Sequence, residues 1–147
     1  MSYTLVETSF EVREPIPDGT VVDAELVEVG ERDGRFWIDK DDHSKGKQRE
    51  INWKFRITED GPFFDRFVWG NTPTWFDNHP ACKFRIWTQE LLGYDELPLG
   101  FELDIEDLPG QPCRIRVKLW ESNGKSGNEV SDVLRATEDS YIDEDPF

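Results

Sequence analysis

The chain has 147 residues, which suits one domain with a core large enough to fold without disulfides or metals. Aromatic residues make up 13% of it, too many for a wholly disordered protein. The net charge of −15, from 32 acidic against 17 basic residues, predicts poor nonspecific attraction to polyanions and, taken alone, argues against a nucleic-acid binder.

Alternating apolar and polar residues predict five strands. The first follows the turn signal "PIPDG", the second and third are joined across "EDG", and the last follows the glycine-rich turn "SNGKSG". In the second and fourth strands, the apolar residues of one face alternate with basic residues of the other. The predicted strands span residues 20–29, 51–59, 63–69, 113–120 and 128–136.

A helix is predicted between the third and fourth strands, over residues 81–93. Phe84, Trp87 or Thr88, and Leu91 recur at helical spacing, and Gly93 suits the end of the helix. Three strands, a helix and two strands is the order of a five-stranded Greek-key barrel of the oligonucleotide-binding (OB) type. An immunoglobulin-like sandwich would have roughly seven strands and no helix. We therefore expect a mainly β, OB-type domain over residues 1–136 and a disordered acidic tail over 137–147.

The acidic charge is unevenly distributed along these elements. Residues 1–34 carry nine acids and two bases, whereas residues 35–58 carry seven bases and four acids. Single-stranded nucleic acid needs Lys or Arg for its phosphates and exposed aromatic faces for its bases. The stretch 35–56, "RFWIDKDDHSKGKQREINWKFR", mixes both kinds of residue, so it is either a binding loop or a solvated loop with Trp37 partly buried. Its candidate binding residues are Phe36, Trp37, Lys45 and Lys47.

The outward faces of the second and fourth strands form a second candidate surface. A solvent-facing antiparallel surface is often charged without further purpose. Here the charge has a single sign and an aromatic residue accompanies it, which indicates an anionic partner: nucleic acid or the chain's own acidic tail. The residues are Lys54, Arg56, Arg114, Arg116, Lys118 and Trp120.

The turn-rich segment 67–80 carries Trp69, Trp75 and Phe76. If these rings are exposed, they would stack on a ligand or contact another protein. Buried, they would close the core. For Trp75 and Phe76 we favour core or lid packing, because aromatic residues are so often buried.

Signals for metal binding and catalysis are weak. His79 and Cys82 have H-x-x-C spacing, but Cys113 and His43 show no paired motif that would complete a zinc site. No nucleophile motif or phosphate-binding glycine loop is present. We expect no enzyme activity, no cofactor and no metal. Two distant cysteines, no signal peptide at the start and no apolar run of membrane-spanning length favour a reduced, cytoplasmic setting away from membranes.

The ending "IDEDPF" resembles the acidic C-terminal tip of bacterial single-stranded DNA-binding proteins. The body, from "PDGTVVDAELVEV" through "INWKFRI" and "DIEDLPGQPCRIRV" to "NEVSDVLRA", looks like phage-encoded proteins of that class with an OB fold. The resemblance implies that the tip docks on replication and repair proteins, with Pro146 and Phe147 as the anchor and Asp143, Glu144 and Asp145 around it. It also implies that the tail competes with DNA for the basic face. A homo-oligomer is possible in such proteins.

The leading hypothesis is a non-enzymatic protein that coats and protects single-stranded DNA during phage replication or recombination and recruits partners by its tip. The alternative, from the net charge, is an acidic DNA mimic or inhibitor that binds a nucleic-acid enzyme of the host. A weaker third is a carbohydrate-binding β-domain that uses exposed Trp residues.

Overall fold

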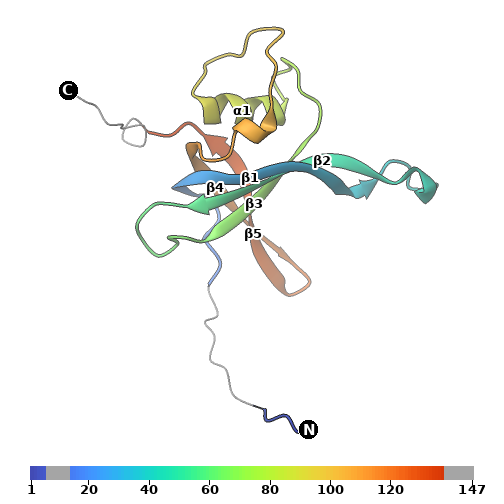
Figure 1. Cartoon of the computed structure of the whole chain (residues 1–147), viewed down its shortest axis with the longest axis vertical. Helices are drawn as coiled ribbons and strands as arrows, with labels where there is room; N and C mark the ends of the chain where they lie inside the picture. Colours follow the sequence, from blue (N-terminus) through green and yellow to red (C-terminus); the bar gives the residue numbers. More distant parts are fainter. Residues whose placement is uncertain (6–13, 138–147) are drawn as a thin grey trace.

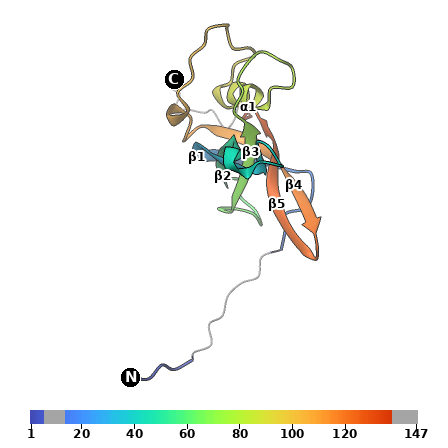
Figure 2. The ribbon, with the colours of Figure 1, turned by 90° about the vertical axis from the view of Figure 1, so that its right-hand side faces the viewer.

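The computed structural model of the chain describes residues 1–5 and 14–137, which contain a five-stranded antiparallel sheet and one α-helix (Figure 1). The strands lie in the order β3-β2-β1-β4-β5, and the helix α1 (Lys83–Leu92) follows β3 and precedes β4. Seen from the side, α1 covers one face of the sheet (Figure 2). The strands are β1 (Thr20–Trp37), β2 (Lys47–Ile57), β3 (Phe67–Pro73), β4 (Pro112–Ser122) and β5 (Lys125–Leu134).

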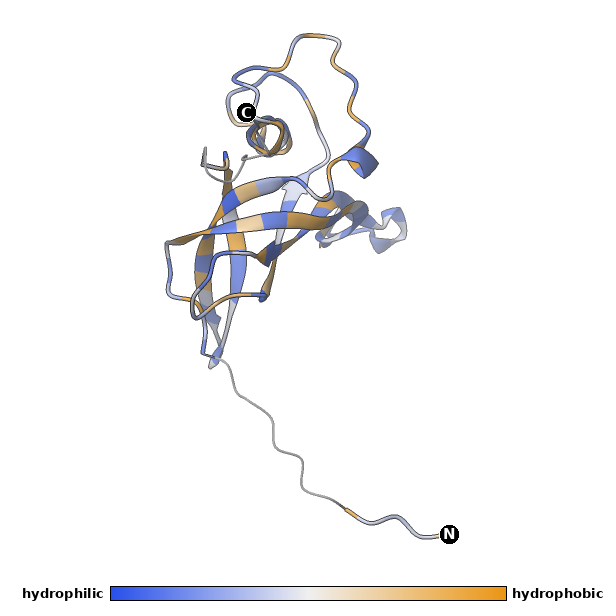
Figure 3. Ribbon diagram, turned by 60° about the vertical axis from the view of Figure 1, so that its left-hand side comes forward, coloured by the Kyte–Doolittle hydropathy of each residue, from blue (hydrophilic) through white to orange (hydrophobic). Residues whose placement is uncertain are grey.

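The alternation of residues along each strand sets which face is buried. In β2, Ile51, Trp53, Phe55 and Ile57 are at most 3% exposed. Successive side chains of a strand point to opposite faces, so the residues between them face outward. Bands of high and low hydropathy alternate along the strands in Figure 3. The predicted inward faces of the first, second and fourth strands are confirmed, since the inward residues of each are buried apart from the half-buried Leu119.

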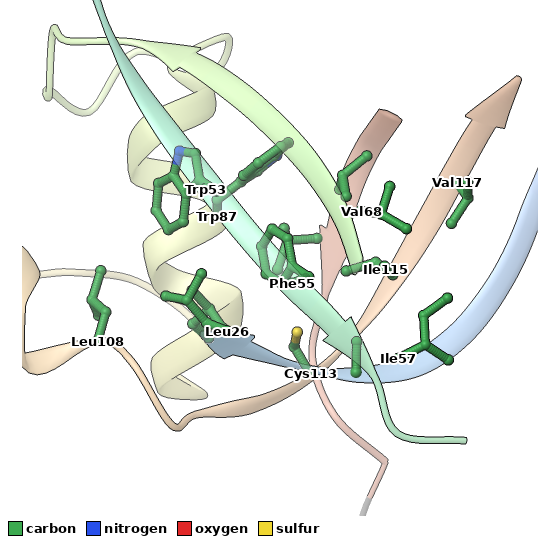
Figure 4. Close-up of a cluster of buried hydrophobic side chains, with 14 of the residues drawn as sticks. Leu26, Trp53, Phe55, Ile57, Val68, Trp87, Leu108, Cys113, Ile115 and Val117 are labelled. Carbon is green, nitrogen blue, oxygen red and sulfur yellow. The ribbon is translucent and has the colours of Figure 1, made fainter. Parts of the chain in front are cut away.

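The core lies between the sheet and α1 (Figure 4). The ring of Trp53 from β2 lies 5.4 Å from that of Trp87 and 5.9 Å from that of Phe84, both from α1, in edge-on arrangements. The Trp53 indole N–H donates to Thr72 Oγ1 at 3.0 Å, so its one polar atom is satisfied. The helix ends where predicted, because Gly93 adopts φ of 76° and its N–H bonds to the Gln89 carbonyl.

The two edge strands of the sheet, β3 and β5, approach each other beneath α1. The two strands meet at Gly70. A Cβ built there would lie 2.7 Å from Trp87 Cη2 and 3.0 Å from Val130 Cβ of β5. Only a residue without a side chain lets Trp87 and Val130 pack against the β3 backbone at this seam. We call this line of contact the β3–β5 seam.

All five strands differ from their predicted bounds, β1 and β3 with the largest consequences. The strand β1 continues past residue 29 to Trp37, because its second half pairs with the start of β2 in a long hairpin. The third strand begins at Phe67 rather than at residue 63. Gly61 at φ of 144° and Asp65 at φ of 68° make the intervening residues a turn instead.

Within the described residues, no helix is long and apolar enough to cross a membrane.

Candidate functional site

Two aromatic rings and a lysine lie together on the outward face of β2 and β3. Phe67 and Trp69 are alternate residues of β3, opposite Arg56 and Lys54 of β2, and are 43% and 45% exposed. The Lys54 ammonium nitrogen lies 4.6 Å from the Phe67 ring centroid and 5.6 Å from that of Trp69, within range of cation–π attraction. We call Lys54, Phe67 and Trp69 the β3 aromatic face. It offers π surface to solvent beside a fixed positive charge.

The basic residues of β2 are paired with acids from neighbouring elements. Lys54 Nζ lies 3.4 Å from Glu28 Oε2 of β1. The Arg56 guanidinium lies 2.7 Å from Glu25 Oε1 and 3.0 Å from Asp65 Oδ1. Its hydrogen bonds to these two carboxylates raise the pKa of Arg56, and the bond to Glu25 has the larger effect.

The basic residues of β4 are also occupied. Arg116 pairs with Asp132 of β5 at 2.9 Å, and Lys118 pairs with Glu129 at 3.7 Å. Arg114 Nε donates to the Arg135 carbonyl at 2.9 Å. The interpretation of a face with a single sign of charge is therefore corrected. Each strand presents bases outward, as predicted, but the strands beside it supply carboxylates at the same level, which the sequence of one strand does not reveal.

The long β1–β2 hairpin carries the remaining predicted residues of the basic island. Phe36 is 68% exposed, and Lys45 pairs with Asp39 at 3.4 Å. Trp37 is not an open platform: the ring of His43 stacks on it at 3.8 Å and 8°, and Lys47 Nζ lies 5.0 Å from its centroid. A base can stack on Phe36 directly, whereas stacking on Trp37 requires a neighbour to move.

Trp120 lies on the β4–β5 hairpin, opposite Gly127. A Cβ at Gly127 would lie 2.6 Å from Trp120 Cζ2, so the indole covers the bare backbone of the glycine. Trp120 remains 39% exposed on its other side. The indole therefore stabilises the hairpin and still presents surface to solvent.

Two adjoining cavities open at the β3–β5 seam. One, of about 210 Å³, is lined by residues of the β1 end, β3, the start of α1, β4 and β5: Arg35, Asn71, Lys83, Lys118, Glu129, Val130 and Ser131. The other, of about 250 Å³, shares Arg35 and Asn71 with the first and extends along the base of the β1–β2 hairpin over residues 34–36, 48–50 and 71–73. Because Asn71 follows Trp69 on the outward side of β3, the cavities continue the surface of the β3 aromatic face.

Sequence reasoning did not single out Arg35, Phe67 or Lys83 as site residues, and it left Trp69 open between stacking and core packing. The alternation Phe67, Trp69, Asn71 is visible in "FVWGNTP", but the strand was predicted four residues too early and the outward side was therefore not recognised. No sequence signal places Lys83, because its role depends on where α1 packs.

The two aromatics after β3 have different fates. Phe76 packs with its ring 4.9 Å from that of Phe84, as the core interpretation expects. Trp75 is 43% exposed, so of the two expectations for this residue, core and lid packing, the first was wrong. It lies in a turn where only the edge of its ring meets His79, at 6.0 Å.

In the described part of the chain, no three His, Cys, Asp or Glu side chains gather as metal ligands. His79 Nδ1 accepts from the Ala81 N–H, and the Cys82 thiol lies 3.3 Å from the Trp75 carbonyl oxygen. The residues of the proposed tip, Asp143, Glu144, Asp145, Pro146 and Phe147, lie outside the described residues.

No protein-family model matches this chain, and no curated protein sequence matches it.

Proposed function

We propose that this protein binds single-stranded DNA without sequence specificity, on the surface that runs from the β1–β2 hairpin across the β3 aromatic face. The observation that carries the proposal is the pair of exposed rings, Phe67 and Trp69, held beside Lys54. Every base has a π face, so stacking on such rings tolerates any sequence, and a nearby cation suits the backbone.

The proposal includes the fold that the order of elements favours, an OB-type Greek-key barrel. It is supported by the strand order β3-β2-β1-β4-β5, by the approach of β3 to β5 at Gly70, and by the helix between β3 and β4. In such barrels the hairpin loops frame a cleft for oligonucleotides. The β1–β2 hairpin projects from the body of the sheet in Figure 1, beside that surface.

The paired carboxylates do not forbid binding. A solvent-exposed ion pair contributes about 0.2–1 kcal/mol, whereas stacking one base on an aromatic side chain contributes about 1–3 kcal/mol. Breaking the Lys54–Glu28 ion pair so that Lys54 can bind a phosphate therefore costs less free energy than stacking one base contributes. The net charge of −15 acts mostly at a distance, and the Debye length is about 8 Å at physiological salt, so local cations outweigh remote acids.

In this account the protein coats and protects single strands in the cytoplasm of a phage-infected host, during replication or recombination. The tip at residues 143–147 recruits partner proteins of those processes. The acidic tail competes with DNA for the basic side chains, as Glu25, Glu28, Glu129 and Asp132 already do within the fold.

The direct experiment is an anisotropy titration of labelled oligo-dT with the full chain at several salt concentrations. We expect saturable binding that weakens as salt rises, because released counterions drive the association. Oligo-dA and oligo-dC of the same length should bind within a few-fold of oligo-dT. No binding at low salt would overturn the proposal.

One observation favours a second candidate, an acidic DNA mimic or inhibitor of a host nucleic-acid enzyme. Lys54, Arg56, Arg116 and Lys118 all have carboxylate partners already, and the chain is strongly acidic. This candidate predicts recovery of a basic nucleic-acid enzyme when the tagged protein is retrieved from host lysate, together with no affinity for oligonucleotides. Binding of oligo-dT in the titration above excludes it as the primary function.

A further inference from the structure

Three basic side chains from three separate elements converge on the cavity of about 210 Å³ at the β3–β5 seam. Arg35 comes from the end of β1, Lys83 is the first residue of α1, and Lys118 comes from β4. Asn71 and Ser131 add polar groups, and Val130 adds an apolar one. We call this cavity the seam pocket. At roughly 30 Å³ per water molecule it has room for about seven waters, and so for a phosphate group with part of its hydration.

The charges of the seam pocket are unbalanced. Its lining contains one acid, Glu129, which lies 3.7 Å from Lys118. Asp132, on the same strand, is held by Arg116 at 2.9 Å. Among the described residues no carboxylate lies within 4.0 Å of Arg35 or Lys83, which instead rest against aromatic rings, Arg35 at 5.8 Å from Phe36 and Lys83 at 4.9 Å from Trp87. These two cations differ in this from the paired bases of β2 and β4.

Lys83 is partly buried, with its ammonium near the Trp87 ring of the core. Burial lowers the pKa of Lys83; the charges of Asp132 and Glu129 act in the opposite direction, and Lys118 lowers it further. A cation that loses hydration without a bonded anion is destabilised relative to one in water. An anion placed between Arg35, Lys83 and Lys118 would offset that loss.

We propose that the seam pocket is a phosphate subsite, in which Arg35, Lys83 and Lys118 hold one phosphodiester of a bound strand. The proposal rests on the proposed function for the identity of the ligand, and it adds the path that the strand takes. Trp69 and Asn71 are alternate outward residues of β3, about 6.6 Å apart along the strand. A base stacked on Trp69 therefore places its neighbouring backbone at the mouth of the seam pocket.

The test compares single charge-neutralising variants of the full chain. Lys83→Gln and Arg35→Gln each remove one cation of the seam pocket, and Lys125→Gln, on the exposed β4–β5 turn, is the matched control outside it. We measure oligo-dT affinity from 50 to 300 mM salt by anisotropy, a range of about sixfold chosen to define the salt slope. Loss of one phosphate contact lowers the magnitude of the slope of log affinity against log salt by about 0.7 for single strands.

We expect Lys83→Gln and Arg35→Gln each to lower the slope by up to that amount, because the three cations share one phosphodiester. Each variant should also weaken binding about tenfold at the lowest salt, since it removes a charge-assisted bond. The loss should be equal for oligo-dT, oligo-dA and oligo-dC, because phosphate contacts carry no sequence information. Lys83→Arg, which keeps the charge, should retain the slope. Lys125→Gln should leave both the affinity for oligo-dT and the salt slope close to those of the wild type.

The two proposals fail differently. If the wild-type protein binds oligo-dT but Lys83→Gln and Arg35→Gln both keep the wild-type slope, the seam pocket is not a phosphate subsite and the proposed function stands. If the wild-type protein binds no oligonucleotide, both proposals are overturned. Unequal losses among the three homopolymers would also contradict a phosphate contact. A thermal melt of each variant confirms that a lost slope is not lost folding.

Discussion

The ammonium nitrogen of Lys54 lies 4.6 Å from the ring centroid of Phe67, across the β2–β3 pair. The same nitrogen reaches Trp69 at 5.6 Å and Glu28 at 3.4 Å. One lysine thus fixes two exposed rings while a carboxylate holds it loosely. This arrangement is suited to a strand that stacks its bases on the rings and exchanges its phosphate for the carboxylate.

Replacing Trp69 with alanine should weaken oligo-dT binding by roughly 5- to 150-fold, because one stacked base contributes about 1–3 kcal/mol. Phe67→Ala should act in the same direction. Both rings are about half exposed, so the loss should not be accompanied by a large loss of stability. Anisotropy titrations measure the affinity. Tyr94→Ala is the control, since this aromatic is 49% exposed on a different surface. Equal effects of Tyr94→Ala and Trp69→Ala would contradict a specific role for the β3 aromatic face.

Gly70→Ala should destabilise the fold by about 1–3 kcal/mol, because it overpacks a buried contact. The added methyl would lie 2.7 Å from Trp87 Cη2 and 3.0 Å from Val130 Cβ. Gly30→Ala on β1 is the matched control: no atom lies within 4 Å of its Cβ position. Urea unfolding followed by far-UV circular dichroism gives the free energy of unfolding for each. If Gly70→Ala and Gly30→Ala unfold alike, β3 and β5 do not close on each other at this seam.

Much of the sheet could be predicted from the sequence, whereas the β3–β5 seam and the ion pairs across the strands could not. The alternation in "INWKFRI" places Trp53 and Phe55 inward without reference to any other strand. The acids opposite Lys54 and Arg56 could not be predicted from the sequence. Which residues of β1 and β2 face each other depends on a register that shifts between Leu26 and Glu28. The position of β3 was misjudged because the aromatic residues before it imitate a strand while Gly61 and Asp65 turn the backbone.

The stability of the protein should fall above pH 9, through Cys113. Burial, with smaller contributions from the charges of Asp23 and Glu25, raises the pKa of this thiol from 9.0 to about 12. A group whose pKa is raised in the folded state binds its proton more tightly there, so its contribution is complete below pH 9.0 and disappears as the pH rises toward about 12. Urea unfolding between pH 8 and 11 tests this, with a limiting slope of about 1.4 kcal/mol per pH unit.

Cys113→Ala is the comparison for that measurement. It should be less stable than the wild type at pH 8, because it leaves space in the core, and should show a shallower decline at alkaline pH. Parallel pH profiles for the two proteins would show that the thiol of Cys113 is not the group responsible.

Deleting residues 138–147 should tighten binding of oligo-dT and abolish recruitment of partner proteins. The deletion removes five side-chain carboxylates that, in this proposal, compete with DNA for the basic side chains. The gain should be largest at low salt and shrink as salt screens the charges. Side-by-side titrations of the full-length and shortened proteins provide the measurement. Unchanged or weaker binding by the shortened protein would refute competition by the tail.

Binding of single-stranded DNA on the outward face that includes Trp69 can be followed by tryptophan fluorescence. The full-length protein is titrated with oligo-dT at low salt and again at high salt, beside the Trp69→Phe variant. We expect saturable quenching in the wild type that salt reverses, and a markedly smaller quenching amplitude in Trp69→Phe while anisotropy still shows binding. Absence of quenching in the wild type, or binding indifferent to salt, would contradict binding on this face.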